Sequence, residues 1–301
     1  MDTIIIDGLS FALPLFIIAI GGIYSEKSGI TNLALEGFQG FGAFTGALAA
    51  VLIANALGTD IQNLFYVALL FAMLGGMAFS VIHAVLSIKF KADQVISGVV
   101  INILALALTT FLTTQINALV FGTASDKFQL GVSQRFTIEG LADIPVIGAI
   151  FTNVYPFEVI IVVIAVFAWY LLYKTRYGMR LRACGENPHS VDTAGVDVAK
   201  IRFSAVLVSG LLSGLGGMCF AYSISANFSS SIYMGYGFLA IAALIFGNWR
   251  IVPTLAACLL FGFAKSGGAF IAQSIALPST FTDLFIILPY LLTLLLLVFF
   301  S

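Results

Sequence analysis

Long stretches without a charged residue most strongly constrain how this chain can fold. Residues 94–125 and 203–249 contain no Asp, Glu, Lys or Arg. A helix needs about 20 apolar residues to cross a bilayer, so each stretch is long enough for one or two spans. Charged residues make up only 9% of the 301 residues, whereas soluble domains carry about 25%. The sequence therefore predicts an all-α, polytopic membrane protein and excludes a soluble enzyme.

Charges and turn residues bound about nine predicted transmembrane helices. The expected spans are 4–23, 30–54, 62–88, 94–119, 157–173, 203–223, 235–248, 251–273 and 281–300. The seventh is short enough to be re-entrant or part of a broken helix. The first lacks a basic region before it, so we interpret it as a retained helix and not a cleaved signal peptide. No repeat or linker divides the chain, which predicts one domain over residues 1–301.

Basic residues orient the predicted spans. One set of alternate connections holds 10 Lys and Arg residues and the other holds 2, with Lys265 left inside a span. An excess of Lys and Arg marks cytoplasmic loops. We therefore expect the N-terminus outside, the loop 174–202 in the cytoplasm and the C-terminal Ser301 in the cytoplasm. Residues 121–155 then form a folded external loop, with room for a short helix.

The second predicted span carries polar residues at helical spacing. Asn32, Glu36 and Gln39 lie at i, i+4 and i+7, which predicts one polar stripe on a helix. A carboxylate within a membrane helix is costly and usually faces the bundle interior or a water-filled cavity. Two interpretations stay open: the stripe lines a pathway for a polar solute, or Glu36 holds a neighbouring helix.

Other polar or small residues within the spans favour helix packing. A polar stripe on the fourth span consists of Gln94, Gly98, Asn102, Ala105, Thr109 and Thr113. Packing is the better interpretation of this stripe, and Asn102 is its strongest candidate for solute contact. Gly210 and Gly214 predict a close helix approach in the sixth span. Lys265 could snorkel, pair with an acid such as Glu36, or contact substrate.

The sequence contains no catalytic, metal or cofactor motif. It lacks HExxH, a Ser/His/Asp set and useful carboxylate pairs, and Lys265-Ser266 lacks the Gly-xxxx-Gly frame of an ATP-binding loop. Cys184, Cys219 and Cys258 have no CxxC spacing, so neither a disulfide framework nor a zinc site is expected. The net charge of −1 gives no sign of a nucleic-acid partner. We expect no enzymatic activity.

The loop 174–202 is predicted to contain a short helix. Asn187-Pro188 is typical of a helix start, and Ala194-Gly195 is typical of a helix end. A short surface helix over residues 189–193 would then lie between two basic arms. From composition alone, a role limited to orienting the spans is an equal alternative.

Three motifs, in the expected order, resemble those of one transporter family. The pattern T-x-Y-G-x-x-x-R-A-x-G-E-N-P followed by A-G-V, from Thr175 to Val196, resembles the coupling loop of ABC importer permeases of the ribose/branched-chain amino acid superfamily. The string SGITNLALEG at 28–37 is similar to a motif of its nucleoside and simple-sugar branch. Asp93 to Gly98 with Asn102 is similar to that branch's (D/E)-x-V-I-S-G-x-x-x-N. The resemblance runs from about Ser25 to the C-terminus.

This resemblance implies a permease subunit of an ATP-driven importer in a bacterial cytoplasmic membrane. Expected partners are a second, usually different permease chain, separate ATP-binding ABC subunits and an extracellular solute-binding lipoprotein. The lipoprotein would contact 121–155 and the loops near 227–234 and 274–280. The coupling loop would insert into a groove of the ATPase through Gly178, Arg182, Gly185, Glu186, Asn187, Pro188 and Gly195. A nucleoside is the expected solute, with Asn32, Glu36, Gln39 and Asn102 as pathway candidates. The alternatives are a simple sugar or other small polar solute or, from another class, a secondary transporter or channel.

Overall fold

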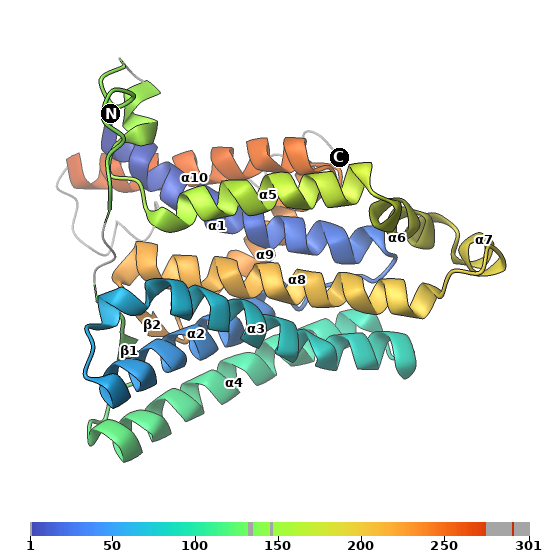
Figure 1. Ribbon diagram of the computed structural model, residues 1–301, viewed down its shortest axis with the longest axis horizontal. Coiled ribbons are helices and arrows are strands. Elements are labelled where there is room, and N and C mark those ends of the chain that lie inside the picture. The colour runs from blue at the N-terminus through green and yellow to red at the C-terminus, as the bar shows by residue number, and fades with distance from the viewer. Residues whose placement is uncertain (1, 132–134, 145–146, 275–290, 292–301) are drawn as a thin grey trace.

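The computed structural model describes residues 2–131, 135–144, 147–274 and 291 (Figure 1). Seven helices within these residues are long and apolar enough to cross a membrane: Asp2–Lys27, Leu35–Leu57, Ile61–Lys89, Gln94–Phe121, Pro156–Lys174, Val198–Ser225 and Ile251–Ala272. The prediction of a helical, polytopic membrane protein is therefore confirmed. A count of nine stays a prediction, because Tyr236–Phe246 is shorter and 281–300 falls outside the described residues apart from residue 291.

The elements follow one another in a simple order. The helices are α1 (Asp2–Lys27), α2 (Leu35–Leu57), α3 (Phe65–Ala84), α4 (Gln94–Phe121), α5 (Pro156–Lys174), α6 (Arg176–Glu186), α7 (Pro188–Thr193), α8 (Val198–Phe220), α9 (Tyr236–Phe246) and α10 (Ile251–Ser274). Short 3-10 turns η1 (Ile61–Leu64) and η3 (Ile147–Phe151) precede α3 and α5, and π-turns η2 (Val85–Lys89) and η4 (Ala221–Ser225) extend α3 and α8. Two short strands, β1 (Lys127–Gln129) and β2 (Asn227–Ser229), complete the elements of the described residues.

Helix α8 lies at the centre of the bundle and packs against α1, α2 and α3. In the span Val198–Ser225, which contains α8, 72% of the residues of an 18-residue apolar stretch are buried. In α4, at the periphery, the buried share of such a stretch is 28%. Glycines allow the closest approach: a Cβ atom on Gly214 would overlap the carbonyl oxygen of Ala72, and one on Gly76 would overlap that of Gly210. The close helix packing predicted from Gly210 and Gly214 is thus confirmed.

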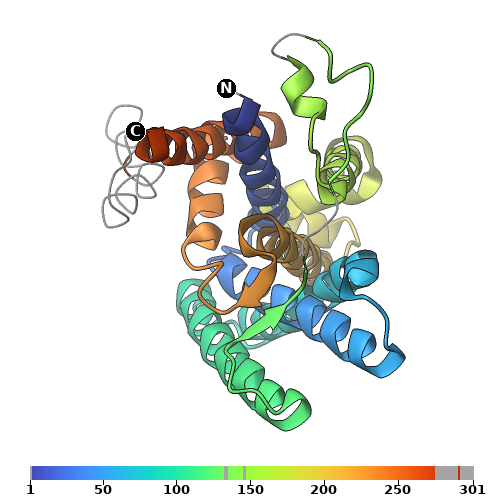
Figure 2. The same ribbon diagram turned by 90° about the vertical axis from the view of Figure 1, so that its left-hand side faces the viewer.

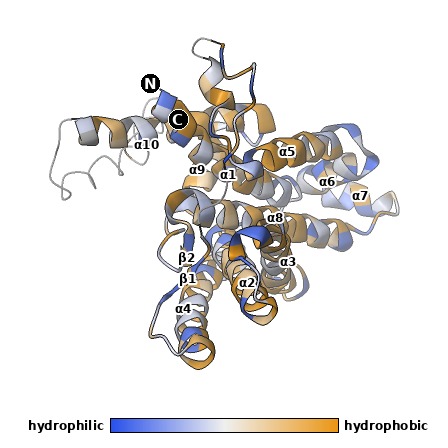
Figure 3. Ribbon diagram, turned by 60° about the vertical axis from the view of Figure 1, so that its left-hand side comes forward, coloured by the Kyte–Doolittle hydropathy of each residue, from blue (hydrophilic) through white to orange (hydrophobic). Residues whose placement is uncertain are grey.

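The two ends of the bundle differ. The N-terminus and the β1–β2 ribbon lie at one end, and α6 and α7 project from the other (Figure 1). Strands β1 and β2 pair antiparallel, with Phe128 opposite Phe228, and lie across the end of the bundle (Figure 2). Among its described residues, the segment 121–155 holds strand β1 and the 3-10 turn η3, and its place outside the membrane stays a prediction. Hydrophobic residues cover the spans and hydrophilic residues gather near their ends (Figure 3).

Candidate functional site

The predicted stripe on the second span is interrupted, because α2 begins only at Leu35. Residues 28–34, termed here the 28–34 segment, form a turn and irregular backbone between α1 and α2. The expectation that Asn32 shares a helix face with Glu36 and Gln39 is wrong. Ser28, Asn32 and Ala34 are nevertheless buried. Irregular backbone in a membrane protein persists where protein groups satisfy its hydrogen bonds, and the 28–34 segment has such partners.

Two side chains of α4 hold this segment. The Oδ1 atom of Asn102 accepts from the N–H of Gly37 at 2.8 Å, while its Nδ2 donates to the carbonyl oxygen of Leu33 at 2.8 Å. Gln94 accepts from the N–H of Thr31 through Oε1 at 2.7 Å. Asn102 therefore links the start of α2 to α4, and both ends of its amide are occupied.

Side chains of α1, α3 and α8 complete the junction. The N–H of Asn32 donates to Oε1 of Glu26 at 3.1 Å, and its Nδ2 donates to the hydroxyl of Ser209 at 2.9 Å. The ring of His83 contacts the carbonyl oxygen of Thr31, with 3.2 Å between Nε2 and O. Four helices thus converge on the 28–34 segment, which makes it a structural junction.

Glu36 reaches the N-terminus of α9. Its Oε2 accepts from the N–H of Gly235 at 2.9 Å, and Gly235 is the N-cap of α9 with φ 87°. The backbones also approach closely, because a Cβ on Gly237 would lie 2.5 Å from Cα of Glu36. A carboxylate is favourable at a helix N-terminus, where backbone N–H groups lack helical partners. The half-buried Glu36 is positioned to cap α9.

Gln39 differs from the other candidates in its hydrogen bonding. Its Nε2 donates to the carbonyl oxygen of Tyr233 at 2.7 Å. Its Oε1 is buried and, among the described residues, has no hydrogen-bond partner. Buried amide groups are normally paired, so this oxygen retains the capacity to accept a hydrogen bond.

Lys265 does not pair with Glu36 in the structure. Its Nζ donates to the hydroxyl of Tyr236 at 2.6 Å and lies 3.9 Å from the ring centroid of Phe11. A cation over an aromatic ring is stabilised by the ring's electron distribution. Lys265 therefore links α10 to α9 and α1, and it also borders a cavity of about 250 Å³ with Asp7.

The predicted helix in the 174–202 loop is confirmed as α7, which covers Pro188–Thr193. Asn187 caps it by accepting from the N–H of Ser190 at 3.1 Å, and Gly195 follows with φ 77°. The preceding basic arm forms a further helix, α6, which the sequence analysis missed. Both helices lie beyond the bundle end (Figure 1).

The coupling-loop candidates have different surroundings. A Cβ on Gly178 would overlap carbonyl oxygens at the end of α5, and one on Gly185 would overlap the carbonyl oxygen of Lys27. Arg182 donates through Nε to the carbonyl oxygen of Gly178 at 3.3 Å. Glu186 and Asn187, by contrast, are exposed. The glycines seat α6 against the spans, and the exposed residues form the face available to a partner.

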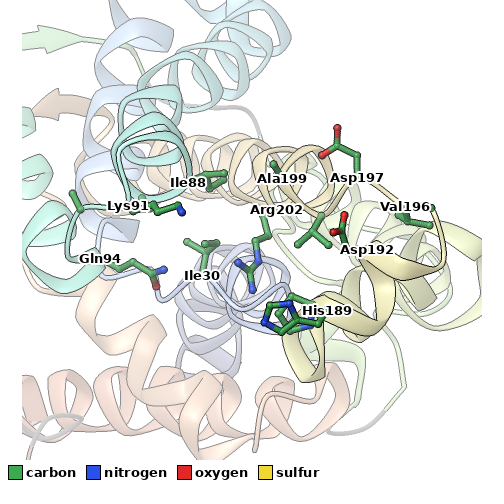
Figure 4. Close-up of a pocket in the computed structure, with 15 residues that line it drawn as sticks. Ile30, Ile88, Lys91, Gln94, His189, Asp192, Val196, Asp197, Ala199 and Arg202 are labelled. Atoms are coloured by element: carbon green, nitrogen blue, oxygen red, sulfur yellow. The ribbon is translucent and has the colours of Figure 1, made fainter.

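A groove of about 840 Å³ lies beside α7 (Figure 4). Its charged and polar lining includes Lys91, Gln94, His189, Asp192, Asp197 and Arg202. Arg202 donates to the carbonyl oxygens of Ser28 at 3.0 Å and Cys184 at 3.3 Å. Burial raises the pKa of the Cys184 thiol, and the charge of Arg202 opposes that rise. No local sequence pattern reveals this groove, because its walls come from distant parts of the chain.

Comparison with known proteins identifies the family. Residues 4–298 match the branched-chain amino acid transport system / permease component family. The chain belongs to this family. It is 40% identical to the guanosine ABC transporter permease protein NupQ of Bacillus subtilis, over 95% of this chain and 88% of NupQ. It is 38% identical to the nucleoside ABC transporter permease protein NupC of Lactococcus lactis, over 100% of this chain and 92% of NupC.

A second Bacillus subtilis protein, the guanosine ABC transporter permease protein NupP, is 27% identical over 91% of this chain and 76% of NupP. No solved structure matches the chain significantly. The family and the apolar helices identify this chain as a multi-pass membrane permease of the ABC transporter type. The resemblance inferred from the three motifs is confirmed.

Proposed function

We propose that this chain carries nucleosides into the cell as one permease of an ABC importer. The observation that supports this most strongly is its 40% and 38% identity, over nearly the whole chain, to permeases named for guanosine and nucleosides. The SGITNLALEG motif, which resembles the nucleoside and sugar branch, agrees with this solute class. A simple sugar or another small polar solute is the alternative within the family.

The proposed complex contains a second, different permease chain. Its support is the presence in Bacillus subtilis of two guanosine permeases, NupQ and NupP, which are 40% and 27% identical to this chain. Separate ATP-binding subunits would hydrolyse ATP and dock on the coupling loop 174–202. An extracellular solute-binding lipoprotein would contact the external loop 121–155. Residues 1–301 would form one permease domain, with its N-terminus outside and its C-terminus in the cytoplasm.

Within this proposal the solute passes through transient hydrogen bonds. Ribose hydroxyls and base edges need donors and acceptors, and a conduit must bind its cargo weakly enough to release it. Gln39 has a buried acceptor atom to offer. Asn32, Glu36 and Asn102 would support the same pathway indirectly, because they position the 28–34 segment, α2 and α9.

Solute-dependent ATP hydrolysis tests this function. This chain would be co-expressed with the partner permease, ATPase and binding protein of the proposed complex, and the complex would be purified and reconstituted in vesicles. We expect guanosine and other nucleosides to stimulate hydrolysis and to accumulate, whereas glucose and ribose do not. Stimulation by a sugar without any response to nucleosides would refute the proposed solute while leaving the transporter type intact.

A further inference from the structure

A second groove, which is apolar, lies between α5 and α10. Helix α1 packs against both of these helices and forms the floor of the groove with Leu13 and Phe16 (Figure 2). The groove has a volume of about 240 Å³, and all the residues that line it are apolar or aromatic and lie within predicted membrane spans. Val166 and Val252 at its rim are exposed. Within the described part of the chain, the groove therefore opens toward lipid.

Two basic residues stand where this groove reaches the end of the bundle that carries α6 and α7 (Figure 1). Lys174 is the last residue of α5, and its Nζ lies 5.8 Å from the ring centroid of Trp169, which lines the groove. Arg250 directly precedes α10, whose first two residues also line the groove. Both cations are exposed. The one ion pair among the described residues joins Lys200 to Asp197, so neither cation is paired with a carboxylate there.

We propose that the groove between α5 and α10 binds an anionic phospholipid. One acyl chain would lie in the groove against Phe16 and Val166, and the phosphate would lie near Lys174 and Arg250. The planar guanidinium of Arg250 suits a phosphate, since its N–H groups can bind two of the oxygens at once. Trp169 fits the same arrangement, because tryptophan is enriched where the hydrocarbon of a bilayer meets the headgroups.

The combination of an apolar groove with two cations favours an anionic lipid over other occupants. A phospholipid of this kind carries an apolar chain and a negative charge in one molecule, so it satisfies both parts of the site. An apolar helix of another subunit would fill the groove but leave the two charges without a partner. A zwitterionic lipid has no net charge to attract them. Each basic residue near the membrane surface favours an anionic lipid by about fivefold.

Quenching of Trp169 by brominated lipid tests this proposal. The chain has two tryptophans, Trp169 and Trp249, and bromine on an acyl chain quenches the fluorescence of an indole that it contacts. The purified permease complex would be reconstituted in phosphatidylcholine vesicles that contain a small fraction of brominated phosphatidylglycerol or, in parallel, of brominated phosphatidylcholine. The contribution of Trp169 is the quenching that Trp169→Phe removes.

We expect brominated phosphatidylglycerol to reach Trp169 with an apparent affinity about fivefold or more above that of brominated phosphatidylcholine. Arg250→Gln should lower this preference about fivefold, because one cationic contact with the phosphate is lost. Lys89→Gln is the matched control. Lys89 is exposed near the same end of the bundle but does not line the groove between α5 and α10, so its variant should keep the preference within about twofold of wild type.

Three outcomes would overturn the proposal. Equal quenching of Trp169 by the two lipids would identify a general lipid boundary without a specific site. A loss of preference in Lys89→Gln as large as that in Arg250→Gln would identify a response to total surface charge. Absence of quenching by either lipid would show that a protein segment covers the groove. If Arg250→Gln does not reconstitute, Lys174→Gln carries the same test, because the preference is a ratio measured on one variant.

Discussion

Replacing Glu36 distinguishes a helix cap from a solute contact. The half-buried carboxylate accepts from the N–H of Gly235 at 2.9 Å. Glu36→Ala would leave that N–H unsatisfied, at a cost of about 1–3 kcal/mol, and would remove a favourable charge at the start of α9 worth about 0.3–1 kcal/mol. The expected loss of unfolding free energy is therefore about 1–4 kcal/mol. Glu36→Gln keeps an acceptor oxygen, so its loss should stay within about 1 kcal/mol.

Thermal unfolding of the purified permease pair in nanodiscs measures this difference. At about 2.1 cal/mol/K of unfolding entropy per residue, a loss of 1 kcal/mol shifts the midpoint of a 301-residue chain by roughly 1.5 °C, so Glu36→Ala should lower it by roughly 2–6 °C. Glu36→Gln should lower it only slightly and retain nucleoside uptake. Glu186→Ala is the matched control, because that carboxylate is exposed and its removal should leave the midpoint unchanged.

An unchanged midpoint for Glu36→Ala, together with lost uptake, would refute the capping argument. The carboxylate would then act on the solute directly. A normal uptake rate with a lower midpoint in the same variant would instead remove Glu36 from the pathway candidates and leave it as a structural residue.

Three further predictions concern other residues. Asn102→Leu loses the two hydrogen bonds that tie the 28–34 segment and the start of α2 to α4, so its unfolding free energy should fall by about 1–3 kcal/mol in the same thermal assay. In a cysteine-free chain, a cysteine at Ser125 should react with an impermeant reagent from outside and one at Ser190 from inside; the reverse pattern would contradict the proposed orientation. Gly185→Ala should lower the thermal stability, because the added Cβ would overlap a carbonyl oxygen of α1. Glu186 is exposed, so Glu186→Lys should keep the fold but uncouple ATP hydrolysis from uptake. Full transport by Glu186→Lys would contradict the docking role of Glu186.

The lengths of the apolar stretches in the sequence predicted most of the transmembrane helices. The expected span 157–173 corresponds to Pro156–Lys174, and 94–119 corresponds to Gln94–Phe121. Bilayer thickness fixes the number of apolar residues that a span needs, and this quantity is visible in one sequence. Asp93 also gives a local start signal, since its side chain accepts from the N–H groups of Val95 and Ile96.

The start of α2 could not be predicted in the same way. Residues 28–34 contain no proline or charge, and helical spacing extends through Asn32. The segment leaves the helix because Gln94 and Asn102 satisfy its backbone groups from another helix. Such partners are distant in sequence, so a local pattern does not reveal them.

The missed helix α6 did carry a usable signal. Gly178, Leu181 and Cys184 recur every three residues, and all three are buried on one face of the helix. The basic residues between them also fit a loop that only orients the spans, so the period alone did not decide between a helix and a loop. Strands β1 and β2 had no comparable signal, because three residues are too few for alternation to be recognised.

The four pathway candidates, Asn32, Glu36, Gln39 and Asn102, differ in whether a buried side-chain atom lacks a hydrogen-bond partner among the described residues. Both ends of the Asn102 amide are bound to backbone groups, Asn32 is tied to Ser209, and Glu36 caps α9. Only Gln39 among the four has a buried side-chain atom that lacks a partner within the described residues. An unpaired acceptor in the interior costs free energy unless water or a ligand satisfies it. We therefore infer that three of the candidates fix the positions of α2 and α9, and that Gln39 is the one whose amide oxygen is available to a passing hydroxyl or base N–H.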